Sequence, residues 1–445
     1  MPVKLGLISL GCAKNLVDSE HMLAMLQEDG IQIVDDVTDA DVAVINTCGF
    51  IEAAKREAIE TILETAQLKE TGSLKALVVT GCLVQRYKDE IAQELPEIDA
   101  VLGTGSYTNI VEAVHAALKN TGHAYEAFDP ISLAEQENAR LLLTPRHYAY
   151  LKIAEGCSNR CAYCVIPQLR GKFRSRTMEN ILEEARELAA SGVREIIVIA
   201  QDITMYGQDL YGKPMLPKLL RQLCALDFTW VRVHYLYPDE ITEEMIEVIA
   251  EEPKIVKYLD IPIQHVNDRI LTAMHRRGNS EYLSKLFAAL RARIPGVVLR
   301  TSLIVGLPGD TNEEFEELCD FLRETRIERV GVFCYSPEEG SEAAEMPDQI
   351  EEAVKQHRRL IIEELQSDIL DSFAARVKGQ LLDVLCEGWD PETGLYYGRC
   401  YADSPDVDGR VLFDSAFSVE EGQFVSVRIN GASGEELEGT TETTE

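Results

Sequence analysis

The sequence predicts an α/β protein made of three successive domains: an N-terminal α/β domain with a parallel sheet, a central partial (β/α)6 barrel, and a small C-terminal antiparallel β-barrel. Three observations support this prediction. In residues 1 to about 100, an apolar run followed by a cysteine and a helix-like segment occurs three times. Strand-like and helix-like segments then alternate six times, and after Gly379 short alternating runs separated by Gly, Asp and Pro turns take their place.

The domain boundaries follow from changes in composition. We expect the first domain at 1–120, a linker at 121–147, the central barrel at 148–376, the C-terminal barrel at 377–433 and a tail at 434–445. The linker contains Gly122, Pro130 and Pro145 and has little periodicity. The tail is rich in Glu and Thr, so it is expected to be acidic and disordered.

In the first domain, each predicted strand ends close to a cysteine. The strands are Lys4–Leu10, Asp41–Ile45 and Lys75–Val79, the cysteines are Cys12, Cys48 and Cys82, and helices are expected at Asn15–Glu28 and Ile51–Gln67. The carboxyl ends of parallel strands share one crevice, so all three thiols should face it. A single cysteine at a strand end is more often a small buried residue. Three cysteines at corresponding strand ends favour a metal site with three cysteine ligands.

The central segment shows the strand and helix alternation of a barrel. Strands are expected at Tyr148–Ala154, Glu195–Ala200, Trp230–Leu236, Tyr258–Gln264, Val298–Val305 and Val330–Tyr335, with helices such as Thr177–Ser191, Glu240–Glu251, Tyr282–Arg293 and Asn312–Glu324 between them. Six units are too few for an eight-stranded barrel and suit an open, partial one. A long helix over Glu351–Arg376 should end it, and Leu381–Cys386, Gly394–Tyr401, Val411–Phe413 and Phe424–Ile429 are the strands expected after it.

A second group of cysteines follows the first strand of the barrel. Cys157, Cys161 and Cys164 have the spacing C-x3-C-x2-C, which gathers soft ligands suited to iron–sulfur or zinc. Structural zinc needs four protein ligands, and the next cysteine, Cys224, lies sixty residues on. A four-iron cluster can instead leave one iron open for a small molecule. A zinc or redox cysteine cluster is the alternative.

These residues carry a family resemblance. The spacing of Cys157, Cys161 and Cys164, with Tyr163 before the last cysteine, resembles the signature of the radical S-adenosylmethionine (SAM) superfamily. Over essentially the whole chain, the three domains in this order look like the methylthiotransferase family, whose C-terminal module is a TRAM-like barrel. The other carriers of the resemblance are Gly11-Cys12-Ala-Lys-Asn15 with Asp18-Ser19-Glu20, Asn46-Thr-Cys48, Gly81-Cys82, Pro167 and Arg170-Gly171.

Within that family, two stretches resemble one branch most. Leu10 to Glu20, and Gln201-Asp202 with Tyr206-Gly207, are similar to the ribosomal-protein aspartate methylthiotransferases (RimO type). The resemblance implies an enzyme, a transferase of sulfur-containing groups, that attaches a methylthio group to the β-carbon of an aspartate in the twelfth protein of the small ribosomal subunit. It further implies two SAM molecules, two 4Fe-4S clusters and a low-potential electron donor.

The resemblance also assigns roles to residues. Cys157, Cys161 and Cys164 would hold the cluster that reduces SAM and so generates the radical. Cys12, Cys48 and Cys82 would hold the auxiliary cluster that carries the sulfur, and no catalytic group beyond the clusters is implied. Expected SAM contacts at the ends of barrel strands are Gln201, Gln264, His265, Arg300 and Gly306, with Asp202, His234, Thr301 and Gly309 as neighbouring candidates.

Two features near these positions allow more than one interpretation. His234 and His265 are equally compatible with ordinary core or surface histidines. Arg170, Lys172, Arg174 and Arg176 form one compact basic segment in an acidic chain, which is either a solvated loop or a lining for carboxylates of SAM or of an acidic target.

Charge and cysteine usage limit the partners. The net charge of −33 would repel phosphates and favours a basic partner, so nucleic acid is not expected. No run approaches the roughly 20 apolar residues of a membrane span. The eleven cysteines are odd in number and mostly follow apolar runs, which fits a reducing compartment. We expect a cytoplasmic protein.

Two other functions share some of these sequence features. The tRNA adenosine methylthiotransferases form another branch of the family, but their C-terminal barrel binds RNA and should be basic or neutral. Here residues 379–445 contain three Lys or Arg and fifteen Asp or Glu, which favours the protein-modifying branch. A non-catalytic iron–sulfur carrier or redox adaptor would need no SAM site, whereas Gln201 and the turn from Gly306 to Gly309 are both present.

Overall fold

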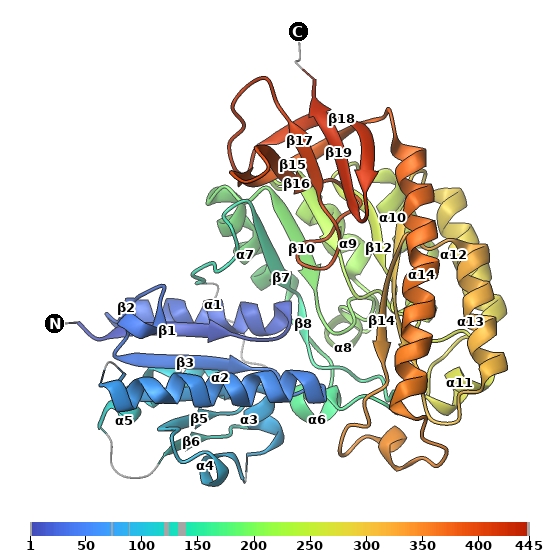
Figure 1. The fold of residues 1–445 in the computed structure, drawn as a ribbon. Coiled ribbons are helices and arrows are strands. Elements are labelled where there is room, and N and C mark those ends of the chain that lie inside the picture. The colour runs from blue at the N-terminus through green and yellow to red at the C-terminus, as the bar shows by residue number, and fades with distance from the viewer. Residues whose placement is uncertain (1, 73, 89, 120–123, 132–138, 443–445) are drawn as a thin grey trace.

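A computed structural model describes residues 2–72, 74–88, 90–119, 124–131 and 139–442. Figure 1 shows the three parts that the sequence predicts: a first α/β domain, a central parallel-stranded barrel segment and a small C-terminal barrel. The predicted fold class is confirmed. Among the described residues, no helix combines the length and the apolar composition that crossing a membrane requires.

The elements lie close to the predicted segments, and several short ones were not predicted. The first domain contains β1 (Lys4–Ser9), α1 (Ala13–Glu28), β2 (Gln32–Ile33), η1 (Val37–Asp39), β3 (Val42–Thr47), α2 (Glu52–Thr71), β4 (Ala76–Gly81), α3 (Cys82–Arg86), α4 (Ile91–Glu94), β5 (Ala100–Leu102), η2 (Tyr107–Asn109), α5 (Ile110–Lys119) and β6 (Tyr125–Ala127).

The central segment contains β7 (Tyr148–Lys152), β8 (Ala154–Glu155), α6 (Ile166–Arg170), β9 (Arg174–Ser175), α7 (Met178–Ala190), β10 (Glu195–Ile199), α8 (Gln208–Tyr211), α9 (Leu216–Cys224), β11 (Trp230–Val233), η3 (Pro238–Glu240), α10 (Glu243–Glu251), β12 (Ile255–Asp260), α11 (Asp268–Ala273), α12 (Ser280–Arg293), β13 (Val298–Val305), α13 (Asn312–Thr325), β14 (Arg329–Cys334), η4 (Glu342–Glu345) and α14 (Glu352–Val377). The C-terminal barrel contains β15 (Leu381–Asp390), β16 (Leu395–Arg399), β17 (Val411–Asp414), β18 (Phe424–Ser433) and β19 (Glu436–Thr441).

The first domain is a parallel sheet with the strand order β2-β1-β3-β4-β5-β6. Its register sets Ile8 beside Ile45 and Ile45 beside Val79, so the strands that precede the three cysteines end at one edge. The predicted linker at 121–147 is wrong in part, because β6 within it pairs in parallel with β5, and residues 121–123 and 132–138 of it lie outside the described part of the chain. This strand was not predicted because it has only three residues, shows no alternation of its own and lies between Gly and Pro residues.

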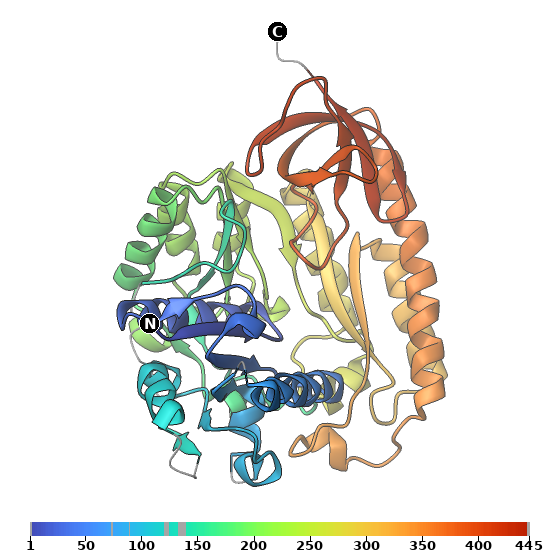
Figure 2. The same ribbon diagram turned by 60° about the vertical axis from the view of Figure 1, so that its left-hand side comes forward.

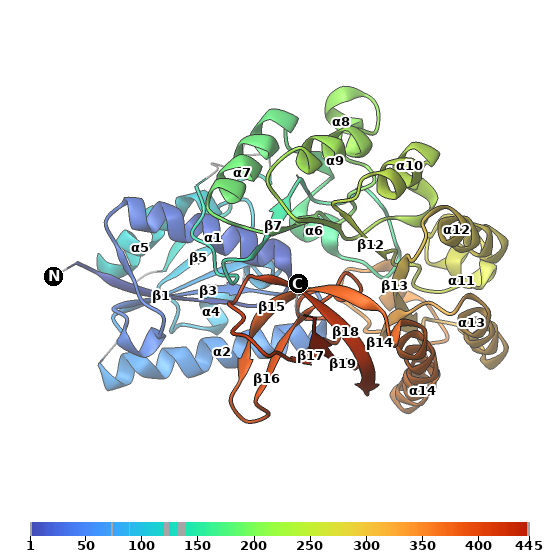
Figure 3. The same cartoon turned by 90° about the horizontal axis from the view of Figure 1, so that it is seen from above.

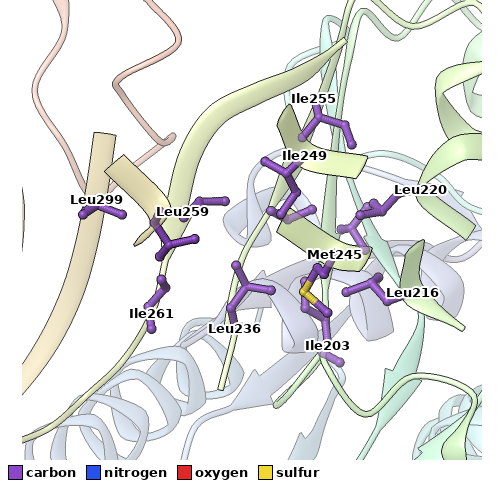
Figure 4. Packing of buried hydrophobic residues seen from close by; sticks show 14 of the residues in the cluster. Ile203, Leu216, Leu220, Leu236, Met245, Ile249, Ile255, Leu259, Ile261 and Leu299 are labelled. Carbon is purple, nitrogen blue, oxygen red and sulfur yellow. The ribbon is translucent and has the colours of Figure 1, made fainter. Parts of the chain in front are cut away.

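The central strands form an open parallel sheet in the order β14-β13-β12-β11-β10-β7. Seen from above, helices α7, α9, α10, α12 and α13 form an arc outside these strands (Figure 3). Apolar side chains fill the layer between strands and helices, among them Leu220 of α9, Met245 of α10 and Leu259 of β12 (Figure 4). Burial of these side chains is the main driving force that holds the helices against the sheet.

The C-terminal module is a closed barrel with the order β15-β16-β17-β19-β18. The predicted tail at 434–445 is wrong for residues 436–441, which form β19 with Leu437 buried in the barrel, while residues 443–445 lie outside the described part of the chain. The barrel is also not wholly antiparallel, since β17 and β19 pair in parallel. A strand with one buried residue and a Glu- and Thr-rich exposed side has the composition of a tail, which explains the error.

The two end domains contact different regions of the central strands. The C-terminal barrel packs at their amino ends, where Trp230, Tyr258 and Val298 share its apolar core. Helix α1 of the first domain packs against the inner side of β7 and β10 through Val17, which contacts Tyr150 and Ile197. Figure 2 shows the first domain low and in front, and the C-terminal barrel at the top beside α14. The carboxyl ends of the central strands therefore face the first domain.

Candidate active site

The first cysteine set, Cys12, Cys48 and Cys82, lies at the carboxyl ends of β1, β3 and β4. Cys12 is the N-cap residue of α1, Cys48 follows β3 directly, and Cys82 begins α3. Gly11 lies so close to Cys48 that a Cβ at Gly11 would come 2.7 Å from the Cβ of Cys48. Its φ of +89° is also one that side-chain-bearing residues rarely adopt. The tight approach of Gly11 therefore brings the loops of Cys12 and Cys48 together.

The thiols of the first set influence one another. Burial, together with the smaller effects of the neighbouring Cys82 and Cys12, raises the pKa of Cys48 to about 12. Burial also raises the pKa of Cys82, although the positive charge of Arg170 opposes this. Grouped thiols in such a setting stay protonated unless a cation compensates their charge, which is what coordination to a metal provides.

The second set lies in the cysteine loop, residues 156–164, between β8 and α6. A Cβ at Gly156 would come 2.3 Å from the carbonyl oxygen of Lys172, so only glycine fits where this loop meets the 170–172 segment. The amide of Cys157 donates to the carbonyl of Gly171 at 3.1 Å, and the amide of Cys164 donates to the carbonyl of Cys161 at 3.0 Å. These bonds fold the loop back so that its three thiols gather.

Aromatic and cationic side chains surround the cysteine loop. The hydroxyl of Tyr237 is 3.9 Å from the Sγ of Cys161, and Nη1 of Arg276 is 3.8 Å from the same sulfur. The guanidinium of Arg276 also lies over the ring of Tyr237, at 4.1 Å from the centroid. Burial raises the pKa of Cys164 to about 12 and that of Cys157 to about 11. A donor beside the sulfur and a buried setting are features that tune iron–sulfur potentials.

The donor sets fit iron–sulfur clusters. Each set offers three soft thiol ligands close to one another, which matches a cubane held at three corners and open at the fourth. In the described part of the chain, no three His, Cys, Asp or Glu side chains are arranged around a single metal ion. The ligands of a four-iron cluster bind separate irons and lie further apart than the ligands of one ion.

A buried network of charged side chains joins the two sets. Arg170 donates from Nε to the Sγ of Cys82 at 3.4 Å, and from Nη1 to Asp18 at 2.6 Å and to Glu155 at 3.2 Å. Lys152 pairs with the same two carboxylates. Asp18 belongs to the first domain and Glu155 precedes the cysteine loop, so these four residues fix one domain against the other at the level of both cysteine sets.

Gln201 extends this network at the end of β10. Its Nε2 donates to Glu155 at 2.7 Å, while its Oε1 is buried and has no hydrogen-bond partner among the described residues. The next residue, Asp202, accepts from Asn159 of the cysteine loop at 2.8 Å. The side chain of Gln201 thus presents one free acceptor close to the loop.

The other predicted SAM contacts occupy different surroundings. Gln264 adopts a φ of +70° and bridges β12 to β13 through its backbone. Arg300 is half-buried and donates to Asp260 at 2.8 Å. The ring of His265 is 1% exposed, with Nδ1 accepting from the amide of Asn267 and Nε2 enclosed beside Asp310. A SAM contact at each of these residues stays a prediction.

The Gly306 turn supports the cysteine loop from behind. A Cβ at Gly306 would come 2.4 Å from the Cγ of Lys355 in α14, so this glycine allows the long helix to approach. Leu307 is buried in one apolar cluster with Ala162 of the cysteine loop. His234 is a satisfied core histidine, since its Nε2 contacts the hydroxyl of Ser404 in the C-terminal barrel at 3.1 Å.

The basic segment 170–176 is not one patch. Arg170 is buried in the network above, and Arg176 is buried against Glu184 at 2.6 Å, whereas Lys172 is exposed. Arg174 donates to the backbone carbonyls of Lys172 and Arg170. Both the solvated loop and the carboxylate lining are wrong for the segment as a whole, because two of its arginines are used in pairs with carboxylates of this chain.

Sequence reasoning missed several residues of the site. The fold brings four of them to the cysteine sets, and Tyr235 contacts one of these, Lys14; the four are Lys14, Glu155, Tyr237 and Arg276. Two of them carried a signal, since Lys14 follows Cys12 by two positions and Glu155 precedes Cys157 by two. The other three stand on distant strand ends and loops where nothing in the sequence marked them.

Comparison with protein-family models gives one match for each domain. Residues 4–103 match "Uncharacterized protein family UPF0004", residues 151–322 match "Radical SAM superfamily", and residues 379–441 match "TRAM domain". The last match includes β19, in agreement with the closed barrel.

Curated relatives are similar over nearly the full chain. The protein called "Ribosomal protein uS12 methylthiotransferase RimO" in Lachnoclostridium phytofermentans is 48% identical, covering 99% of this chain and 100% of its own. Its namesake in Symbiobacterium thermophilum is 49% identical over 98% and 91% of the two chains, and that in Clostridioides difficile is 46% identical over 98% of each.

Solved structures agree with the fold. The radical SAM methyltransferase TsrM from Kitasatospora setae superposes with a TM-score of 0.57 at 14% identity, covering 75% of this chain and 73% of its own. The cobalamin-dependent SAM radical enzyme OxsB superposes with a TM-score of 0.52 at 12% identity, covering 82% of this chain and 56% of its own. At such identities the likeness concerns the fold alone.

Proposed function

The chain belongs to the family of ribosomal protein uS12 methylthiotransferases of the RimO type, and on that premise we propose that it attaches a methylthio group to the β-carbon of an aspartate in that ribosomal protein. One observation supports the proposal independently of the family: Arg170 joins the two three-cysteine sets of adjoining domains. It contacts Cys82 of the first set and Glu155, which directly precedes the cysteine loop.

In this proposal each set of cysteines holds one 4Fe-4S cluster. Cys157, Cys161 and Cys164 are the ligands of the SAM-cleaving cluster, and Cys12, Cys48 and Cys82 are the ligands of the auxiliary cluster. When bound, the clusters supply one-electron cleavage of SAM and the sulfur for transfer, chemistry that no ordinary side chain provides. The chain contributes alignment, because the pairs of Arg170 and Lys152 with Asp18 and Glu155 fix the spacing of the two sets.

We assign the binding of SAM to side chains around the cysteine loop. The buried, unpaired Oε1 of Gln201 is an acceptor for the ammonium group of SAM, because leaving such an acceptor empty is unfavourable. Tyr237 and Arg276 cover the opposite flank of the loop at Cys161. Gln264, His265, Arg300 and Gly306 stay further candidates for contacts with SAM.

Charge supports a basic protein as the substrate. The C-terminal barrel and following residues contain three Lys or Arg against fifteen Asp or Glu, which would repel the backbone of tRNA. This barrel lies at the amino ends of the central strands, whereas the cysteine sets lie at the carboxyl ends. A basic partner that docks on the barrel would therefore need to extend along the central domain to reach the clusters.

The reaction requires an electron donor of low potential and a reducing compartment, and we propose the cytoplasm, where ribosomal proteins are made. The eleven cysteines agree with this, since all are free thiols in the structure.

The proposal is tested by anaerobic turnover of the reconstituted protein with SAM and dithionite. Purified ribosomal protein uS12 and unmodified tRNA are offered in parallel, and both are analysed by mass spectrometry. We expect a methylthio group in place of one hydrogen on an aspartate peptide and none on tRNA. The same group on adenosine would assign the chain to the tRNA-modifying reaction, and an absence of SAM cleavage would favour a cluster carrier.

A further inference from the structure

Lys14 is a buried cation without an anionic partner. Its side chain lies in the first turn of α1, is 6% exposed, and has its Nζ 3.2 Å from the centroid of the Tyr235 ring. Within the described residues, Lys14 has neither an ion pair nor a hydrogen-bond acceptor for its ammonium group. The face of an aromatic ring is its one polar contact there.

Several other buried cations of the described residues are paired with carboxylates, whereas Arg276, like Lys14, has no carboxylate partner there and lies over a tyrosine ring, that of Tyr237. Lys152 lies between Asp18 and Glu155, Arg170 contacts the same two carboxylates, and Arg232 donates to Glu195 at 2.7 Å. An unpaired buried charge is unfavourable, and a ring face compensates only part of the lost hydration. The absence of a carboxylate at Lys14 among the described residues therefore indicates a position for an external anion.

Short segments of the chain connect Lys14 to both cysteine sets. Lys14 follows Cys12 by two residues, and its ring partner Tyr235 follows the end of β11. Two residues beyond Tyr235, the hydroxyl of Tyr237 is 3.9 Å from the sulfur of Cys161. Lys14 is thus connected to the first set through α1 and to the cysteine loop through the segment from Tyr235 to Tyr237, and the target carbon must reach both sets.

Two further cations, Arg232 and Arg300, act on His234 together with Lys14. Burial lowers the pKa of His234, and the charges of Arg232, Arg300 and Lys14 lower it further. His234 stays neutral as a result, so it adds no charge of its own. Asp260 pairs with Arg300, and Glu195 pairs with Arg232, which leaves Lys14 as the cation of these three that lacks a carboxylate in the described chain.

We propose that the ammonium group of Lys14 binds the carboxylate of the target aspartate. This inference rests on the proposed function and adds the residue that selects the substrate side chain. The carboxylate of aspartate is one bond from the β-carbon, so fixing it at Lys14 orients that carbon between the two clusters. An adenine base carries no anionic group, and Lys14 would have no corresponding role in modifying adenosine.

The test compares Lys14→Met and Lys14→Arg with wild type in the reconstituted enzyme. Binding of uS12 is measured anaerobically with SAM present, using the protein with its target aspartate and a version with asparagine there. Wild type should bind the aspartate form about tenfold more tightly or better, as expected for a charge-assisted hydrogen bond. Lys14→Met should lose this preference, and Lys14→Arg should retain part of it.

A matched control and one further readout separate this role from a structural one. Lys75→Met removes an exposed lysine of the same domain, which pairs with Asp41, and should leave the preference unchanged. Lys14→Met should melt no lower than wild type, because it removes an unpaired buried charge.

Three results would overturn the inference. If Lys14→Met still preferred the aspartate form of uS12, another group would be the one that binds the carboxylate. A shift in the potential of the auxiliary cluster with the preference intact would identify Lys14 as a counter-charge for that cluster. If wild type left the aspartate of uS12 unmodified, the proposed function would fail, and this inference would fail with it.

Discussion

Arg170 donates a hydrogen bond from Nε to the sulfur of Cys82 at 3.4 Å, across the boundary between the central barrel and the first domain. The same guanidinium donates to Asp18 and Glu155, so one buried side chain touches a cysteine of the first set and the residue that leads into the cysteine loop. Donors to a ligating sulfur and their buried charge are known determinants of cluster potential. Arg170 is thus placed to influence both alignment and redox behaviour.

Replacing Arg170 should change the potential of the auxiliary cluster. Arg170→Gln removes the positive charge beside Cys82 and shortens the donor. Adding an electron to the auxiliary cluster therefore becomes less favourable, and its midpoint potential should fall by tens of millivolts. The measurement is a redox titration followed by electron paramagnetic resonance. A Cys157→Ala background, in which the auxiliary cluster is the one expected to remain, isolates its signal.

Arg174→Gln is the matched control, because Arg174 donates to backbone carbonyls and not to a cysteine. It should leave the potential unchanged. Arg170→Gln should also lower the free energy of unfolding by about 3–5 kcal/mol, since Asp18 and Glu155 lose a buried partner. An unaltered potential in Arg170→Gln would mean that the contact with Cys82 serves alignment alone.

A steric prediction concerns β19, the last strand of the C-terminal barrel. A Cβ at Gly439 in β19 would come 2.4 Å from Cγ1 of Val427 and 2.7 Å from the carbonyl oxygen of Arg428, whereas a Cβ at Gly431 in β18 would meet nothing within 4 Å. We expect Gly439→Ala to destabilise the C-terminal barrel by about 1–3 kcal/mol and Gly431→Ala to be tolerated.

Tryptophan fluorescence during thermal unfolding reports on this barrel, because Trp389 lies in β15 and Trp230 packs against Phe424 at 4.7 Å between ring centroids. These are the two tryptophans of the sequence. Equal melting temperatures for the two glycine variants would argue that residues 436–441 do not belong to the folded barrel.

Glu184 predicts a pH dependence of stability. Burial would raise the pKa of this carboxyl group, but Arg176 and Arg140 outweigh burial and lower the pKa from 4.5 to about 2. A carboxyl group with a depressed pKa stabilises the folded state above its unfolded value of 4.5, and this contribution, about 3 kcal/mol, is lost as the pH falls towards 2.

Urea unfolding of the metal-free protein at pH 7 and pH 3 checks this. Glu184→Gln should be clearly less stable than wild type at pH 7, and the difference should narrow at pH 3. Glu187→Gln, an exposed glutamate on the same helix, should match wild type at both values. A gap for Glu184→Gln that is independent of pH would show that the loss arises from packing and not from ionisation.

Much of the fold could be predicted from local patterns. Apolar runs that end in Cys12, Cys48 and Cys82 locate strand ends, and the topology of a parallel sheet then brings them to one edge without knowledge of any contact. The strands β5, β6 and β19 were missed because β5 and β6 have three residues each and β19 buries only Leu437, so their sequences show no alternation.

The site was predicted less completely than the fold, for a physical reason. Asp18 and Arg170 are 152 residues apart, and whether an arginine pairs with a carboxylate of its own chain is decided by burial. For that reason the sequence did not show that Arg170 and Arg176 of the basic segment 170–176 pair with carboxylates of this chain. Similarly, Lys14 belongs to the segment Gly11–Asn15 that carries the family resemblance. That it lacks a carboxylate partner among the described residues becomes visible only when α1 is packed against Tyr235.

The measurement that tests the account most directly is a comparison of Cys157→Ala with Cys82→Ala under reducing, anaerobic conditions, with cleavage of SAM to 5′-deoxyadenosine and methylthiolation of uS12 measured in the same reaction. We predict that Cys157→Ala abolishes both activities, whereas Cys82→Ala still cleaves SAM and forms no methylthio product. Loss of both activities to the same degree in the two variants would contradict separate roles for the two cysteine sets.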